Sequence, residues 1–153
     1  MKRLHDSGLL IVILILLLSQ IVFAQQELRI CALRVSFQED QNSLTTGDGL
    51  FLMDTTDNET YTIDPPPHNR SYFKDQIIAV KNYFLAASKG QLMISGEVFP
   101  ISQNDSYQLP YEMNYYNPNT TDEENDRQLA QLLIDAVQMA DADADIDFSQ
   151  FDV

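Results

Sequence analysis

The stretch from residue 61 to residue 100, YTIDPPPHNRSYFKDQIIAVKNYFLAASKGQLMISGEVFP, decides the fold because it contains a turn, a helix, a helix stop and a strand in succession. Its Pro65-Pro66-Pro67 run fixes three successive φ angles and predicts a stiff polyproline approach to the helix. Residues 91–99 alternate in the period of a strand, and Pro100 is expected to end it. We therefore treat this unit as the scaffold of the domain.

The helix of this unit is expected over residues 71–88. Ser71 is the preferred N-cap, with Asn69 as the alternative, and Asp75 is expected in the first turn, where a negative charge suits the helix dipole. Lys89 is expected to face the negative dipole end, and Gly90 to supply the left-handed residue at the stop. One face carries the regularly spaced apolar residues Phe73, Ile77, Val80, Phe84 and Ala87. This stripe predicts packing against a hydrophobic core.

Two further elements flank the scaffold. Residues 28–37 alternate as a strand that is apolar on both faces at its start, which is typical of a strand inside a covered sheet rather than at an exposed edge. Residues 121–140 predict a second helix, because Thr121 and Glu124 fit a capping box. Residues 107–116 contain four tyrosines and Pro110, and we expect an ordered loop there. A carbohydrate-binding role for these tyrosines is the less favoured interpretation, since loop tyrosines usually pack.

Composition and charge restrict the class of protein. Of the 153 residues, 44% are hydrophobic and 21% are charged, which is ordinary for one globular domain. Nine Lys and Arg stand against 23 Asp and Glu, so the formal net charge is -14. Because such a charge repels phosphates and anionic membrane surfaces, we do not expect nucleic acid binding.

Residues 1–24 have the pattern of a signal peptide. Lys2 and Arg3 form a basic start, residues 9–18 are uninterruptedly apolar, and cleavage is expected after Ala24. The alternative is an uncleaved membrane anchor, although the apolar region is slightly short of the ~20 residues that a spanning helix needs. The expected location is therefore outside the cytoplasm: secreted, periplasmic or at the cell surface, with membrane contact only through an uncleaved leader.

Candidate catalytic and metal-binding side chains are few. His5 leaves with the leader, which makes His68 the single histidine of the mature chain, and no H-E-x-x-H sequence is present. One imidazole cannot furnish the ligands of a catalytic zinc, and a histidine just before a helix is most often a turn or capping residue. Cys31 is the single cysteine, which leaves no partner for an intrachain disulfide, and we expect it to be a small buried residue of the first strand. No residue is therefore assigned as catalytic, cofactor-binding or metal-binding.

A calcium site is the one metal interpretation that the residues themselves suggest. Aspartates at positions 141, 143, 145 and 147 resemble the start of an EF-hand loop. The pattern then fails, because Ile146 occupies the place of the required glycine and Asp152 replaces the bidentate glutamate. A solvated acidic segment after the helix is the favoured interpretation.

Taken together, several short motifs resemble one family. The combination of a tyrosine-phenylalanine helix start, a serine-lysine-glycine helix end and a terminal Phe-Ser-x-Phe-Asp is similar to the opening of the catalytic region of the immune inhibitor A-like bacterial metallopeptidases. The motifs that carry the resemblance cover nearly the whole mature chain: Leu33-Arg34-Val35-Ser36-Phe37, Ile63-Asp64-Pro65-Pro66-Pro67-His68, Ser71-Tyr72-Phe73, Ala87-Ser88-Lys89-Gly90, Gly96-Glu97-Val98-Phe99-Pro100 and Asp147-Phe148-Ser149-Gln150-Phe151-Asp152.

The resemblance implies an α+β fold: the N-terminal half of a zincin, with a small mixed sheet covered by two amphipathic helices. It also implies a secreted zinc endopeptidase as the parent protein, acting on proteins or peptides, with residues 25–153 as the N-terminal portion of its catalytic domain, truncated before the zinc motif. Zinc would be bound by the full-length parent and not by this chain, which we expect to be inactive alone. The alternative is a non-catalytic exported module that binds a protein or a glycan.

Overall fold

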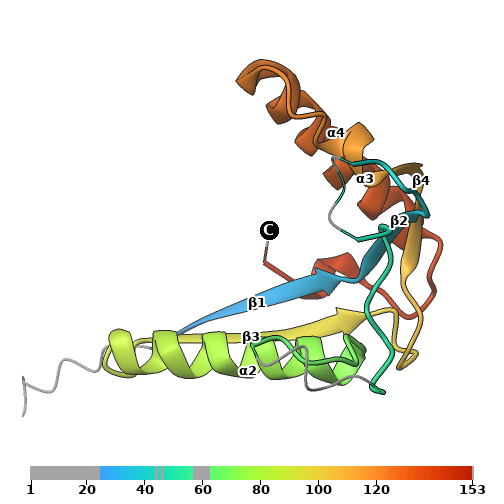
Figure 1. Ribbon diagram of the computed structural model, residues 1–153. Coiled ribbons are helices and arrows are strands. Elements are labelled where there is room, and N and C mark those ends of the chain that lie inside the picture. Colours follow the sequence, from blue (N-terminus) through green and yellow to red (C-terminus); the bar gives the residue numbers. More distant parts are fainter. Residues whose placement is uncertain (1–24, 44, 46, 57–62, 153) are drawn as a thin grey trace, which may run out of the picture.

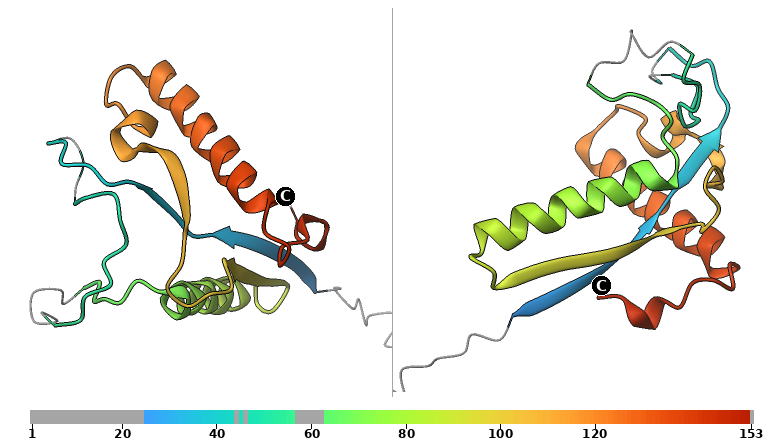
Figure 2. Two further views of the ribbon diagram at one scale, coloured as in Figure 1. Left: turned by 90° about the vertical axis from the view of Figure 1, so that its right-hand side faces the viewer. Right: turned by 90° about the horizontal axis from the view of Figure 1, so that it is seen from below.

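The computed structural model describes residues 25–43, 45, 47–56 and 63–152. The predicted leader, residues 1–24, lies outside these residues. The fold is α+β, as expected, and its elements follow the order β1 (Gln26–Leu33), β2 (Val35–Gln38), α2 (Arg70–Ala87), β3 (Leu92–Phe99), β4 (Tyr107–Glu112), α3 (Met113–Tyr116), α4 (Asp122–Asp141) and the 3-10 helix η1 (Phe148–Gln150). Helices α2 and α4 lie on opposite sides of the strands (Figures 1 and 2).

The first strand pair joins the two strands that the sequence predicted. β1 and β3 run parallel, with Gln26 opposite Leu92 and Leu33 opposite Phe99. Gly96 allows this close approach, because a Cβ at that position would lie 2.5 Å from Ile30 Cγ1 and 2.6 Å from the Ile30 carbonyl oxygen. The cis Phe99–Pro100 peptide follows the strand, so Pro100 ends it as predicted.

The expected single strand over residues 28–37 is divided at Arg34. The Arg34 N–H donates to the Phe99 carbonyl (2.7 Å), and the Arg34 carbonyl accepts from the Tyr107 N–H (2.8 Å). The chain thus passes from pairing with β3 to pairing with β4, and β2 and β4 form the second parallel pair, with a register irregularity between Ser36 and Gln38.

The prediction of a loop over residues 107–116 was wrong. These residues form β4 and the short helix α3. Tyr107 pairs with Val35 of β2, a contact between residues far apart in the chain. Pro110, three residues later, does not prevent the strand. Tyrosine is a favourable strand residue, and its alternation was obscured here by the proline.

Helix α2 is displaced by one residue from its prediction. Its N-cap is Asn69, whose side chain accepts from the Tyr72 N–H at 3.1 Å, so the preference for Ser71 was wrong. Because the helix begins at Arg70, Asp75 falls in its second turn, and the first turn holds no acidic residue. The approach to the helix also differs from a continuous polyproline segment, since the Pro66–Pro67 bond is cis.

The end of α2 is a Schellman motif. The Gly90 N–H donates to the Leu85 carbonyl (2.7 Å), and the Lys89 N–H donates to the Ala86 carbonyl (3.1 Å). Lys89 has φ 55° and Gly90 has φ 82°, so the left-handed conformation predicted for Gly90 is present and begins one residue earlier, at Lys89. Lys89 therefore lies beyond the helix, and the last turn of α2 contains no basic residue.

Helix α4 begins as the sequence predicts. Thr121 is the N-cap and its side chain accepts from the Glu124 N–H (3.3 Å), with three acidic residues in the first turn. The Glu124 side chain returns to the Thr120 hydroxyl (3.0 Å) instead of completing the capping box. The helix ends at Asp141, one residue beyond the predicted range.

A small core lies between α4 and the β2–β4 pair. It contains Leu109, Tyr116 and Ala136, against which Leu33, Val35, Phe37 and Leu132 pack. The buried Tyr116 hydroxyl donates to Asp135 at 2.7 Å. The outer part of the predicted apolar face of α4 is uncovered, since Leu129 is 53% exposed and Leu133 is 64% exposed. Among the described residues, no helix combines the length and the apolar character needed to cross a bilayer.

Candidate functional site

His68, the candidate histidine, lies immediately before the N-cap of α2. Its backbone N–H donates to the Leu52 carbonyl (2.8 Å), which fixes the chain ahead of the helix. Its Nε2 lies 3.4 Å from Asp64 Oδ1 and is buried without a hydrogen-bond partner among the described residues, because this approach lacks hydrogen-bond geometry. The ring packs on Tyr72, with 4.7 Å between centroids. Position and contacts are those of a turn residue preceding a helix.

Tyr72 and Asp64 complete this cluster. The Tyr72 hydroxyl donates to Asp64 Oδ1, and this bond is the main reason that the pKa of Tyr72 lies above its usual value. The cluster thus consists of one imidazole, one carboxylate and one phenol held in the protonated state. Within the described ranges, none of the contacts of the imidazole joins it to a serine or cysteine nucleophile, which nucleophilic catalysis of the triad type needs.

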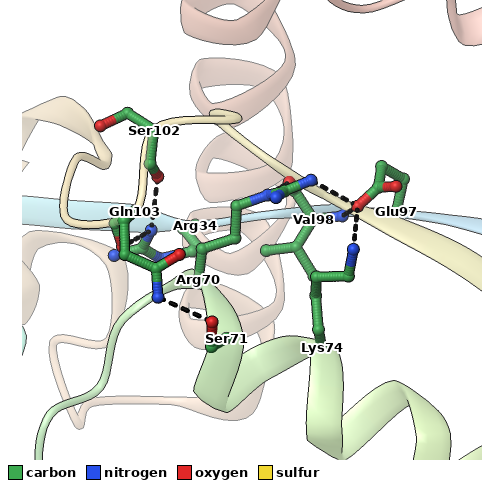
Figure 3. A network of polar contacts seen from close by, with 8 residues as sticks. All are labelled: Arg34, Arg70, Ser71, Lys74, Glu97, Val98, Ser102 and Gln103. Atoms are coloured by element: carbon green, nitrogen blue, oxygen red, sulfur yellow. Dashed lines mark hydrogen bonds and ion pairs between the residues drawn. The ribbon is translucent and has the colours of Figure 1, made fainter.

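A second polar cluster joins the start of α2 to β3 (Figure 3). Arg70 Nε donates to the Val98 carbonyl (2.8 Å), and Arg70 Nη2 donates to Glu97 Oε1 (2.7 Å). Lys74 Nζ lies 3.4 Å from the same Glu97 oxygen. Partial burial raises the pKa of Glu97, but the Val98 N–H, Lys74 and Arg70 outweigh it and hold that pKa below its usual value. These contacts fasten the helix to the strand.

Arg34 is a buried cation next to this polar cluster, at the start of α2. Only 2% of the residue is exposed, and its guanidinium lies over the rings of Phe51 and Phe73, at 5.4 Å and 5.8 Å from their centroids. Nη1 donates to the carbonyls of Ser102 (3.3 Å) and Gln103 (3.1 Å). Burial lowers the pKa of Arg34, with Asp105 opposing and Arg70 adding to the effect. This burial was not predicted from the sequence, because arginine is almost never fully buried.

The acidic segment is exposed at Asp141, Asp145 and Asp147, as the favoured interpretation expected, and Asp143 bonds to the rest of the fold. The Tyr107 hydroxyl donates to Asp143 at 2.5 Å; burial and this bond raise the pKa of Tyr107 above its usual range, while Tyr107 lowers the pKa of Asp143. Asp147 caps η1 by accepting from the Ser149 N–H (3.1 Å) and hydroxyl (2.6 Å). In the described part of the chain, no group of three His, Cys, Asp or Glu side chains is arranged to hold a metal ion.

Cys31 lies on β1 and is partly buried, and this burial raises the pKa of its thiol. It is therefore a strand residue of low reactivity at neutral pH, since the thiolate is the reactive form.

A comparison with protein families identifies the class. The model of the immune inhibitor A peptidase M6 catalytic domain matches residues 21–153, and the chain belongs to this metallopeptidase family. Comparisons with curated proteins and with solved structures gave no match.

Metallopeptidases of this family are generally zinc-dependent, so the residues present can be tested against that metal. A catalytic zinc takes three protein ligands, two of them from H-E-x-x-H in the family's pattern. The sequence contains two histidines, His5 and His68, and no H-E-x-x-H. These residues do not fit a catalytic zinc site, and no reaction step is derived through the metal for this chain.

Proposed function

We propose that this chain is the N-terminal, zincin-like portion of the catalytic domain of a secreted zinc-dependent endopeptidase, and that it hydrolyses no peptide bond by itself. Its role is to supply the scaffold on which the zinc-binding part of the domain is assembled. The substrates of the assembled enzyme are proteins or peptides, in keeping with the peptidase family.

One observation carries this proposal: the family model extends over residues 21–153, yet the sequence lacks the zinc motif on which the family's chemistry depends. The polar junction at the start of α2 supports the same interpretation. Arg70 and Lys74 both pair with Glu97, and Arg70 also bonds to the strand backbone, so their arrangement fastens α2 to β3.

An activity assay tests the proposal. The purified chain is incubated with zinc and casein, beside a family member that contains H-E-x-x-H as the positive control. We expect no release of peptides above background from this chain. Cleavage that appears with zinc and disappears with a chelator would contradict the proposal.

Export is the second part of the proposal, and the pattern of residues 1–24 supports it. Expression of the chain in a bacterial host should deliver it outside the cytoplasm with a new N-terminus at Gln25. Retention of Met1 on a membrane-bound product would instead favour the uncleaved anchor.

A non-catalytic exported module that binds a glycan is the second candidate, and one observation favours it. The rings of Tyr111 and Tyr115 stack at 4.1 Å between centroids, and both residues are exposed. Exposed aromatic rings are suited to stack on sugar rings. This candidate predicts that the chain unfolds cooperatively alone and that Tyr111→Ala abolishes retention on a glycan array, whereas Tyr83→Ala does not; no retention of the unaltered chain would exclude it.

A further inference from the structure

Four asparagines of this chain begin an Asn-x-Ser/Thr sequence in which x is not proline: Asn58, Asn69, Asn104 and Asn119. This is the acceptor sequence for N-linked glycans on exported proteins, and because the glycan is bulky and polar, an acceptor must lie at the surface. With nine asparagines in the chain and a serine or threonine at about one position in eight, chance alone gives about one such sequence. The chain therefore carries more of these sequences than its composition accounts for.

Asn104 and Asn119 lie on exposed turns between elements. Asn104 belongs to the turn that follows β3, and Asn119 belongs to the turn that precedes α4, where its φ is 54°. Both residues are exposed, and neither side-chain amide has a hydrogen-bond partner among the described residues. Each Nδ2 atom can therefore carry a large substituent that extends into solvent, and no hydrogen bond of the fold is lost.

Asn69 has the opposite arrangement. Its Oδ1 accepts from the Tyr72 N–H (3.1 Å) as the N-cap of α2, and the residue is partly buried. Ser71, which completes its acceptor sequence, accepts a hydrogen bond from the Gln103 side chain (2.8 Å). A glycan on Asn69 would lie where α2 meets the turn after β3, and it would crowd the contacts that hold the start of the helix. Asn58 lies outside the described residues.

The hydroxyl groups that complete the two exposed acceptor sequences are engaged in the folded chain. Ser106 Oγ donates to Ser36 Oγ (2.9 Å), and the Thr121 side chain accepts from the Glu124 N–H (3.3 Å) as the N-cap of α4. A transferase that recognises the hydroxyl two positions after the asparagine must therefore meet it before the chain folds. Export provides that stage, because a leader of the kind at residues 1–24 directs an unfolded chain across a membrane.

We propose that Asn104 and Asn119 each carry an N-linked glycan, attached while the chain is exported. The donor is an oligosaccharide linked to a lipid phosphate. Nδ2 attacks carbon C1 of the first sugar: the bond from Nδ2 to C1 forms, and the bond from C1 to the phosphate oxygen breaks. The lipid phosphate leaves with the bonding electron pair, and one amide proton passes to a base of the transferase. The inference rests on the export part of the proposed function and does not depend on peptidase activity.

The exported protein of the organism that encodes this chain tests the proposal. Proteolysis after glutamate separates the two asparagines, because Glu97, Glu112 and Glu123 flank them. In mass spectrometry, peptides 98–112 and 113–123 should each be heavier than their sequence by at least one sugar, whereas peptide 60–97, which contains Asn69, should keep its sequence mass. An unmodified Asn104 or Asn119 would overturn its assignment, and equal modification of Asn69 would overturn the distinction between exposed and capping asparagines.

The same sample separates this inference from the proposed function. A chain that begins at Gln25 and carries no glycan overturns the inference and leaves export intact. A chain that keeps its leader in the cytoplasm and carries no glycan counts against export and the inference together. The assay with casein and zinc decides the peptidase part of the proposed function independently of both.

Matched variants locate the attachment in a yeast host, which adds N-linked glycans to Asn-x-Ser/Thr. Asn119→Gln should remove the added mass from peptide 113–123 alone, and Asn104→Gln should remove it from peptide 98–112 alone. Asn117→Gln is the control, because Asn117 is an exposed asparagine on the same turn without a hydroxyl two positions later. It should leave both glycans in place. Loss of a glycan in the control, or an unchanged mass of peptide 113–123 after Asn119→Gln apart from the substitution itself, would overturn the assignment.

Discussion

The two faces of the strands differ in how completely they are covered. On the α2 face, Arg34 is enclosed by aromatic rings and Arg70 bonds to both the backbone and a side chain of β3. On the α4 face, Leu129 and Leu133 remain more than half exposed. The predicted packing of the α2 stripe in a core was also wrong in part, since no residue of α2 is buried and Val80 and Phe84 are 39% and 38% exposed. The comparison teaches that a regular apolar stripe predicts a helix but not its partner. Whether an apolar stripe is buried depends on which other segments of the folded chain pack against it.

The largest expected effect comes from a substitution on the α2 side of the strands, where β1 and β3 pair. Gly96→Val should destabilise the chain by about 3 kcal/mol, because the added side chain meets the backbone of Ile30, which cannot move without opening the β1–β3 pair. Urea unfolding followed by circular dichroism measures the change. Ser95→Val, at the adjacent and partly exposed position, is the control and should cost much less. A Gly96→Val chain as stable as the original would contradict the close approach of β1 and β3 at this position.

A smaller effect is expected where α3 meets α4. Tyr116→Phe removes the donor to the buried Asp135 and should cost about 2 kcal/mol, since a buried carboxylate loses a charge-assisted hydrogen bond. Asp135 keeps its bond from Gln131 (2.8 Å), which limits the loss. Thermal unfolding checks this value, with Tyr115→Phe as the exposed control. Equal melting temperatures for the two variants would mean that this bond adds nothing to the α4 face.

The smallest effect concerns the ion pairs that Glu97 forms with Arg70 and Lys74. The folded pKa of Glu97 lies below the unfolded value of about 4.5, so its contribution is present above pH 4.5 and is lost as the pH falls through the folded pKa. Because the Glu97 side chain is 40% exposed, solvent screening keeps the contribution on the order of 0.5 kcal/mol.

Glu97→Gln should accordingly lose less stability than the unaltered chain between pH 5 and pH 3, and the two should differ most at neutral pH. Unfolding free energies across this range provide the measurement, and Glu123→Gln, on the exposed first turn of α4, is the control. Identical pH profiles for the Glu97 variant and the unaltered chain would exclude this contribution.

Local chemistry explains what the sequence predicted correctly. The Thr121 cap, the stop at Gly90 and the strand ending at Pro100 each depend on residues within a few positions of one another. The choice between Asn69 and Ser71 was wrong because both are good caps. Contact decided it: the Arg70 N–H donates to the Gln103 carbonyl, and the Ser71 hydroxyl accepts from the Gln103 side chain (2.8 Å).

In the candidate site, too, local features could be predicted from the sequence and contacts between distant residues could not. Counting histidines in the sequence predicts that a zinc site of the family's type cannot be completed by these residues. The burial of Arg34 and the bond from Tyr107 to Asp143 could not be predicted, because each joins residues far apart in the chain. Among the described residues β1 pairs with one strand only, at an edge of the sheet, which was missed for the same reason: a strand's own residues indicate that it is apolar on both faces, not how many neighbours it has.

The sequence by itself determined the two long helices, the strands on either side of α2, the net negative charge and the absence of the zinc motif, because these depend on local stereochemistry and on composition. Only the tertiary structure decided that one strand is shared between two pairs at Arg34, that residues 107–116 form a strand and a helix, and that Leu129 and Leu133 of α4 are left exposed. Those features depend on hydrogen bonds and packing between segments far apart in the chain. Local sequence patterns do not show which distant segments meet.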